Sequence, residues 1–310
     1  METRTSSGVL YLCATPIGNL EDITLRVLRT LKEVDLVAAE DTRHTRKLFS
    51  RYDIHTPLTS YHEHNRQAKE GYLLEQLLSG KHVALVSDAG TPGISDPGEE
   101  LVRKAVDNGV QVTALPGPSA LLAALTISGL SLHTFAFEGF LPASKKERRT
   151  RLAKLAKETR TMVVYESPHR LVKTLGELAD FLGSGRRACM ARELTKFYED
   201  VQRSTLGELH ALMSNHSIKG EFVLVIEGCD AQSYWGGCIA SNCPEDNIAE
   251  LVPATEQYLD ETDSFGLSLE DLFNLFKEEG MAPNKAIKLI ARLKNISRRE
   301  LYNRIHKQKK

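Results

Sequence analysis

Residues 82–98 have the sequence HVALVSDAGTPGISDPG, which joins a short apolar run to a turn of unusual composition. From Ser87 onward, twelve residues contain three glycines, two prolines and two aspartates. An apolar run bounded by turn residues is typical of a buried strand in a parallel sheet. Gly90 and Gly93 on either side of Pro92 form a rigid turn whose backbone can approach a ligand closely. Taken alone, the segment predicts a strand followed by either a structural turn or a ligand-binding loop.

Similar apolar, β-branched runs recur through the first third of the chain and alternate with helical patterns. They are VLYLCA (9–14), DLVAAE (35–40), VALVSD (83–88) and VTALPG (112–117). This alternation predicts a mostly parallel sheet with crossover helices, and such sheets bind ligands beyond the carboxyl ends of their strands. The loops that follow the four runs are ATPIGNL, EDTRHT, SDAGTPG and LPGPSA. Four unusual loops on one sheet edge favour the ligand-binding interpretation and predict a site there.

The pattern changes after Leu130. The predicted strands HTFAFEGF, TMVVYES, RACMARE and EFVLVIEG, with the apolar helix LVKTLGELADFL between them, indicate a second α/β domain. A stretch rich in Gly, Ser, Asn, Pro and acidic residues then predicts a linker. Capping patterns and the stripe of Ala286, Leu289, Ile290 and Leu293 predict a small helical module. The predicted parts are a first α/β domain (1–130), a second α/β domain (131–230), a linker (231–264) and a basic helical module (265–310).

Composition excludes several classes of protein. No apolar run approaches the roughly 20 residues that span a bilayer, and METRTSSGVLYLC lacks the apolar core of a signal peptide, so we expect a cytoplasmic protein. The five cysteines include no CxxC pair, which favours reduced thiols over disulfides or a zinc site. The HxH pair of His62 and His64 has no second ligand pair at suitable spacing, so we expect no metal. The formal net charge of -1 says nothing about a nucleic-acid partner.

The nucleotide-binding motifs that glycine-rich loops often form are absent. Neither ATPIGNL nor SDAGTPG fits GxGxxG, and SGKHV has His82 where a phosphate-binding loop needs Ser or Thr, so dinucleotide and triphosphate sites are disfavoured. Asp88 stands at a strand end, where its carboxylate can accept hydrogen bonds from a ligand or cap the following turn. Asp41 and Asp96 leave the same two alternatives open.

Charged residues also follow two strands of the second domain, in YESPHR (165–170) and RELTKFYE (192–199). Buried ion pairs would explain them. Charged groups just past strand ends, facing the loops of the first domain, would equally serve a cleft enzyme in orienting a substrate and removing a proton.

Basic residues are concentrated in the stretches 145–157 and 285–310, and the second follows an acidic stretch. Such runs are usually solvated helix faces. In the second stretch, however, the separation of basic from acidic residues favours contacts with the phosphates of a nucleic acid. Arg43 and Arg46, near a predicted helix start, suit an anionic partner or a solvated face equally. The candidate contacts are Arg43, Arg46, Lys145, Arg148, Arg149, Lys285, Lys288, Arg292, Arg298 and Arg299.

Nine segments together resemble a known family. ATPIGNLEDIT, AEDTRHTRKL, SYHEHN, VALVSDAGTPGISDPG, LPGPSA, GFLP, YESPHR, RELTK and KGEFVLVIEG are similar, in order, to the bacterial small-subunit ribosomal RNA methyltransferase I family of the tetrapyrrole methylase superfamily. The likeness covers residues 8 to about 229 and continues more weakly through GMAPNKAIKLIARLKNISRRELYNRI. It implies an α/β, two-domain tetrapyrrole-methylase-like fold (class III methyltransferase) with a small helical module, and a homodimer.

The resemblance further implies an S-adenosylmethionine-dependent enzyme that methylates the ribose 2'-hydroxyl of a cytidine in the decoding region of small-subunit ribosomal RNA. Its implied cofactor contacts are Pro16, Gly18, Asn19, Asp88, Ala89, Gly90, Thr91, Pro92, Gly93, Ile94, Pro116, Gly117, Ser119, Ala120, Glu166 and Arg192. Because RELTK ends a predicted strand that faces the cleft, we hypothesise that Glu193 or Lys196 removes or orients the proton of the 2'-hydroxyl.

Two alternative functions remain open. A methylase of a small molecule such as a tetrapyrrole precursor would share the fold, although the basic carboxyl-terminal stretch argues against it. A noncatalytic RNA-binding or ribosome-assembly factor would share the basic stretch, but it would not need four pocket loops on one sheet edge.

Overall fold

The computed structural model describes residues 7–214 and 218–229, together with seven positions further along the chain: Phe273, Ala286, Ile287, Ile290, Ala291, Ser297 and Leu301. The chain divides into two compact units, Met1–Gly228 and Cys229–Lys310. In the second unit, Ala286 and Ile290 of the predicted apolar stripe are buried with Phe273 and Leu301. The predicted linker, and the candidate contacts Lys285, Lys288, Arg292, Arg298 and Arg299, lie outside the described residues.

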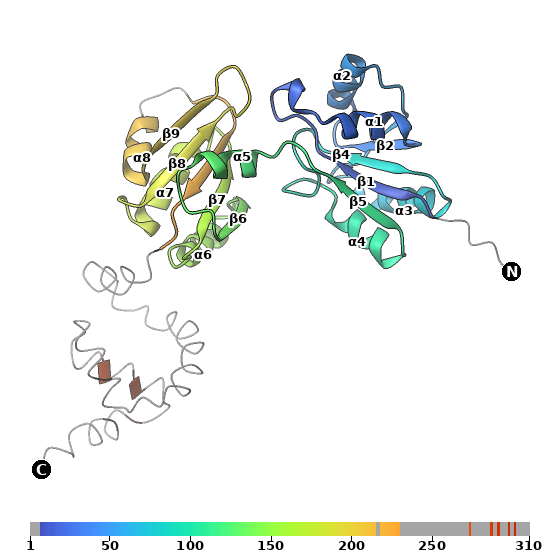
Figure 1. The fold of residues 1–310 in the computed structure, drawn as a ribbon. Coiled ribbons are helices and arrows are strands. Elements are labelled where there is room, and N and C mark those ends of the chain that lie inside the picture. Colours follow the sequence, from blue (N-terminus) through green and yellow to red (C-terminus); the bar gives the residue numbers. More distant parts are fainter. Residues whose placement is uncertain are drawn as a thin grey trace, which may run out of the picture. The chain divides into compact units, whose positions relative to one another are not determined.

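The first sheet is parallel throughout, as predicted. It has the strand order β3-β2-β4-β1-β5 (Figure 1). Its strands are β1 (Val9–Cys13), β2 (Leu36–Ala39), β3 (Leu58–Ser60), β4 (Val83–Val86) and β5 (Gln111–Leu115). The connecting helices are η1 (Leu20–Asp22), α1 (Leu25–Glu33), α2 (Thr42–Tyr52), α3 (Arg66–Leu78) and α4 (Glu99–Asp107).

Burial on both faces of this sheet explains the continuous apolar runs in its central strands. Every residue of β2 and β4 is buried. Their alternate side chains pack on one face against α1 and α2, and on the other face against α3 and α4 (Figure 1). A strand that is covered on both sides has no solvent-facing positions, so LVAA and VALV contain no polar residue.

The second sheet is mixed, with the order β6-β7-β10-β8-β9. Only β6 and β7 run parallel, and the other neighbours are antiparallel. Its strands are β6 (Phe135–Phe140), β7 (Thr161–Glu166), β8 (Arg187–Arg192), β9 (Asp200–Thr205) and β10 (Phe222–Ile226). One face packs against α6 (Lys145–Leu155), α7 (Leu171–Leu182) and α8 (Leu206–Ser214).

Helix α5 (Ala120–Ile127) covers the other face of the second sheet, which shifts a boundary predicted from the sequence. Ala124 and Leu125 are buried in one cluster with Val163, Cys189 and Val225. The predicted boundary after residue 130 therefore comes too late, because the chain passes from one sheet to the other at residues 116–119, between β5 and α5. Among the described residues, no helix combines the length and the apolar character that crossing a bilayer requires.

Candidate active site

The loops after β1 and β4 are joined by backbone hydrogen bonds at the carboxyl edge of the first sheet. We call residues 14–19 the β1 loop and residues 87–98 the β4 loop. The amide of Thr15 donates to the carbonyl of Gly90 at 2.9 Å, and the amide of Gly90 donates back to the carbonyl of Thr15 at 2.9 Å. Gly90 has φ of +80°, a conformation that strains other residues, so the glycine is required by this close pairing. The Thr15 hydroxyl also donates to the Ser87 carbonyl at 3.1 Å.

The loop after β5 (residues 116–119, the β5 loop) completes this arrangement. The hydroxyl of Thr91 donates to the carbonyl of Pro118 at 3.3 Å. A Cβ atom on Gly117 would lie 2.8 Å from the Cβ of Ala14, so a larger residue would separate the β5 loop from the β1 loop. The structure thus brings together the three loops that were predicted to hold a cofactor, and leaves their backbone close-packed where glycines occur.

Carboxylates gather beside these loops. Asp88 accepts a hydrogen bond from the amide of Asp41 at 3.0 Å, while Glu40 accepts from the amide of Asp88 at 3.4 Å. Burial, followed by the charge of Asp88, raises the pKa of Glu40. Burial, followed by the charge of Glu40, raises the pKa of Asp96 to about 6. Glu40 was missing from the predicted site, although its place directly after the apolar run of β2 was a signal that could have found it.

We expect Asp96→Asn to stabilise the protein in a pH-dependent way. The pKa of Asp96 rises from 3.8 to about 6 on folding, so the ionised side chain opposes folding. This cost is absent below about pH 4 and complete above about pH 7. The full shift corresponds to about 3 kcal/mol, and partial exposure of Asp96 to solvent reduces this, so the substitution should raise the free energy of unfolding by about 1–2 kcal/mol at neutral pH and change it little near pH 4. Urea denaturation at both pH values measures the difference, and an equal effect at both would contradict the assignment.

The loop after β8 (residues 193–199, the β8 loop) carries both candidate proton-handling residues. The Nζ of Lys196 donates to Glu193 Oε1 and to Glu221 Oε2, at 2.9 Å each. Desolvation lowers the pKa of Lys196, but these two hydrogen bonds outweigh it and the pKa is raised overall. Desolvation raises the pKa of Glu193, but its hydrogen bonds to Lys196 and to the amide of Glu221 lower it overall. The pair is therefore an ammonium and a carboxylate at neutral pH.

Two contacts connect the β8 loop with the β1 loop. The amide of Asn19 donates to the hydroxyl of Thr195 at 3.1 Å. A Cβ on Gly18 would lie 2.4 Å from the Cγ of Lys196, so the absence of a side chain at Gly18 is what leaves room for the lysine stem. The structure thus places Glu193 and Lys196 directly beside a predicted cofactor loop.

Two residues of the predicted sites do not fit their expected roles. The Glu166 side chain is fully buried and accepts hydrogen bonds from the Ser167 amide at 2.8 Å and the Thr174 hydroxyl at 2.6 Å. Arg148, which is 4% exposed, donates from Nε to Glu177 at 2.5 Å and from Nη2 to Thr174 at 2.6 Å. Both residues belong to a buried polar network. A contact of Glu166 with S-adenosylmethionine and a contact of Arg148 with RNA are therefore disfavoured. Buried ion pairs, the alternative explanation for charges in this part of the chain, account for them.

We expect Arg148→Ala to destabilise the protein rather than weaken RNA binding. The substitution removes the buried guanidinium from Glu166 and Glu177, which keep only Arg170 at 3.5 Å and Lys173 at 3.9 Å. Breaking a buried pair costs up to about 3–5 kcal/mol. Chemical denaturation measures the loss. The neighbouring Arg149 is exposed and serves as the matched control, because Arg149→Ala should change stability by less than about 0.5 kcal/mol. Equal stabilities of the two variants would contradict the structural role of Arg148.

The remaining predicted RNA contacts among the described residues are exposed and Arg192 is partly exposed, whereas Gly90 and Pro92 of the β4 loop are buried. Arg43 pairs with Asp41 at 2.7 Å but keeps 85% of its side chain exposed. Arg46 and Lys145 are exposed as well. Arg192 donates from Nε to the carbonyl of Lys219 at 2.8 Å, and its guanidinium lies 6.0 Å from the ring centre of Phe222. These positions remain compatible with the predicted contacts.

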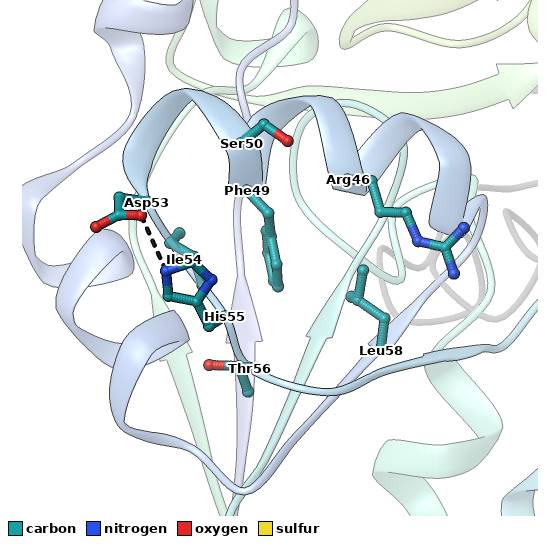
Figure 2. A pocket seen from close by; sticks show the side chains of 8 residues that line it. All are labelled: Arg46, Phe49, Ser50, Asp53, Ile54, His55, Thr56 and Leu58. Carbon is teal, nitrogen blue, oxygen red and sulfur yellow. Dashed lines mark ion pairs between the residues drawn. The ribbon is translucent and has the colours of Figure 1, made fainter.

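A surface pocket lies away from these loops, at the end of α2 and in the segment that leads into β3 (Figure 2). It is lined by Arg46, Phe49, Ser50, Asp53, Ile54, His55, Thr56 and Leu58. His55 Nε2 lies 2.9 Å from Asp53 Oδ1, with both side chains more than 80% exposed. Because Leu58 begins β3, this end of the pocket lies at the amino edge of the sheet, opposite the edge that carries the β1, β4 and β5 loops. Apart from Arg46, which is also a predicted RNA contact, the pocket shares no residue with the candidate site.

Comparisons with known proteins agree with this geometry. The model of the tetrapyrrole (corrin/porphyrin) methylases matches residues 9–210. The ribosomal RNA small subunit methyltransferase I of Bacillus subtilis (strain 168) is 43% identical over 303 residues, which cover 98% of this chain and 96% of the relative. The protein of the same name from Synechocystis sp. is 52% identical over 221 residues, 71% of this chain and 79% of the relative.

Solved structures share the fold at low sequence identity. Uroporphyrin-III C-methyl transferase from Thermus thermophilus, complexed with S-adenosyl homocysteine, has a TM-score of 0.51 at 23% identity and covers 71% of this chain and 97% of its own. Diphthine synthase has a TM-score of 0.55 at 16% identity, with 71% and 90% covered. The matched family model and the long, highly identical relatives lead to one conclusion: the chain belongs to the tetrapyrrole methylases, and within them to the ribosomal RNA small subunit methyltransferase I family.

Proposed function

We propose that the protein transfers a methyl group from S-adenosylmethionine to the ribose 2'-oxygen of a cytidine in small-subunit ribosomal RNA. Membership of the family supports the donor and the reaction, and the names of the relatives support ribosomal RNA as the acceptor. The observation that carries the proposal is the contact between the β1 loop, with its backbone exposed at Gly18, and the β8 loop that holds Lys196.

The donor fits the three loops at the edge of the first sheet. Its charged amino-acid end and its ribose hydroxyls need a few directed acceptors and backbone groups, rather than the phosphate-binding loop that this sequence lacks. Asp88 supplies a carboxylate within the β4 loop, and the exposed Gly117 keeps the backbone of the β5 loop accessible. When bound, the donor supplies a methyl group that its sulfonium already activates. The residues that would hold it are those of the β1, β4 and β5 loops. Glu166, which the resemblance had added to this set, is buried elsewhere and is left out.

The acceptor hydroxyl would be held by the β8 loop. Lys196, protonated because its pKa is raised, can donate a hydrogen bond to the 2'-oxygen and stabilise negative charge that develops there. Glu193, ionised because its pKa is lowered, can accept the hydroxyl proton. Alignment of the 2'-oxygen with the methyl carbon supplies much of the acceleration, up to roughly 7–11 kcal/mol.

Phosphate contacts complete the substrate site in this proposal. Lys145 and Arg149 begin an exposed basic surface on α6, and Arg43 and Arg46 form another on α2. The basic module of residues 265–310 would add further contacts. We also infer a cytoplasmic homodimer. The apolar side chains of Leu122 and Phe140, each about half exposed, support a contact with a second copy.

Transfer of radiolabel from S-adenosylmethionine to small ribosomal subunits tests this function. Subunits are purified from a strain that lacks the modification, labelled, digested to nucleosides and separated. The expected product is labelled 2'-O-methylcytidine. Subunits from a strain that already carries the modification serve as the control and should take up no label. Label in a tetrapyrrole precursor and none in RNA would favour the small-molecule methylase instead.

A further inference from the structure

Two neighbouring aromatic side chains of the β8 loop are unusually exposed. Phe197 has 92% and Tyr198 has 70% of its surface accessible. Their ring centres lie 5.0 Å apart and their planes are perpendicular. Full exposure of a phenylalanine ring forfeits the free energy that burial of its large apolar surface would yield. Such paired, solvent-facing rings are a feature of surfaces that bind a partner.

The loop that presents these rings is held in one conformation. Leu194 is 7% exposed and packs in the core against Val163 and Val223. Glu193 and Thr195 have φ of 51° and 66°, which non-glycine residues adopt only when their surroundings enforce it. The amide of Thr195 donates to Glu199 at 2.5 Å. The exposure of Phe197 and Tyr198 therefore results from an anchored loop.

The rings also lie next to the reacting groups of the proposed site. Phe197 directly follows Lys196 in the chain, and Thr195 of the same loop accepts the hydrogen bond from Asn19 in the β1 loop. A ribose whose 2'-oxygen reaches Lys196 brings its own base, or the base of the next nucleotide, within reach of these rings. The rings meet at a right angle, so one base can stack on the face of one ring and touch the edge of the other.

We propose that Phe197 and Tyr198 form a stacking platform for an unpaired base of the RNA acceptor. This inference rests on the proposed function and adds a recognition element to it. Enzymes that act on single-stranded RNA commonly stack splayed-out bases on aromatic side chains, which tolerates any base because every base has a π-face. Electrostatic attraction contributes little at this position, because Glu193 and Glu221 compensate the charge of Lys196. The platform should therefore bind in a way that depends weakly on salt.

Substitutions that keep or remove the rings test the platform in the full-length protein. Phe197→Ala and Tyr198→Ala should each lower kcat/KM for small ribosomal subunits by roughly 5- to 100-fold, mainly through KM. Affinity for S-adenosylmethionine, measured by calorimetry, should not change. Phe197→Trp and Tyr198→Phe should retain the activity, whereas Phe197→Leu, which keeps an apolar side chain without a ring, should not. Tyr72→Ala removes an aromatic ring that is 42% exposed on α3 and is the matched control.

Each outcome decides between the platform and its rivals. If the wild-type enzyme is active and the alanine variants have the same kcat/KM as the wild type, the platform is overturned while the proposed function stands. A shift of the alanine variants toward monomer in sedimentation, with no change in KM, would assign the rings to contact with a second copy of the chain. A wild-type enzyme that binds S-adenosylmethionine but transfers no methyl group to RNA would overturn the proposed function together with the platform. If the difference in RNA affinity between the wild type and the alanine variants shrinks steeply as salt is added, the effect is assigned to phosphate contacts.

Discussion

Lys196→Met is expected to lower the rate of methyl transfer at saturating RNA by about 10²- to 10⁴-fold, with little change in affinity for S-adenosylmethionine. The ammonium of Lys196 is fixed by Glu193 and Glu221 at 2.9 Å each, so it is already oriented before substrate binds. Methionine has a similar length but donates no hydrogen bond and carries no charge. The developing charge on the 2'-oxygen would then lose its nearest cation, and Glu193 would lose one of the two groups that orient it.

Single-turnover kinetics with labelled donor measure this effect on the chemical step, and calorimetry measures donor affinity. Glu221→Gln is the matched control, because it removes the more exposed of the two partners, at 79%, and leaves the pair of Lys196 with Glu193. We expect the single-turnover rate of that control to fall by less than about tenfold, because an exposed ion pair contributes little free energy. A full single-turnover rate for Lys196→Met would remove this lysine from the mechanism.

Gly18→Ala is expected to lower kcat/KM by about 10²-fold without unfolding the protein. The new Cβ would lie 2.4 Å from the Cγ of Lys196 and 3.1 Å from the carbonyl oxygen of Leu194. Both atoms belong to the β8 loop, so either the lysine stem or the whole loop must move away from the β1 loop. A displacement of about 1 Å is enough to lose an aligned geometry for in-line transfer.

Steady-state kinetics with small subunits measure this loss, and circular dichroism checks the fold. The matched control is Gly71→Ala on α3, where a Cβ would meet no atom within 4 Å. That substitution should leave activity unchanged and stabilise the helix by about 0.5–1 kcal/mol. Wild-type kcat/KM in Gly18→Ala would mean that the contact between the two loops is not needed for catalysis.

The sequence predicted the central strands and the edge strands β5 and β6, but it missed the edge strands β3 and β9, for a physical reason. β2 and β4 are buried on both faces, so their sequences are unbroken apolar runs. β9 is an edge strand whose residues DVQRST include no buried position, so it lacks the apolar pattern that marks a strand. β3 is only three residues long and equally polar. The helix ALLAALTI (α5) was clearly apolar, but its composition could not tell which of two sheets it covers.

The candidate site divides in the same way. Loops that follow buried parallel strands meet at one edge as a matter of topology, so the β1, β4 and β5 loops could be placed together from the sequence. Whether a single charged side chain is buried or exposed could not be predicted from the sequence. Arg148 stands in the run KKERRTR, where charge alone suggests exposure, yet its partner Glu177 lies in another helix, 29 residues away. Glu166 is buried through the same network, and only tertiary packing reveals it.

The central place of β1 has a consequence for how the protein is made. Leu10 pairs with Val83 on one side and with Val112 on the other, so β1 leaves the ribosome before either of its two neighbours. About 70 residues separate β1 from β4, which corresponds to roughly 4–15 s of synthesis at 5–20 residues per second. During that interval VLYLC offers two unpaired edges to other nascent chains. Slowing translation between residues 14 and 83 would lengthen this exposure and increase misfolding, whereas slowing it after residue 115 would spare the first sheet.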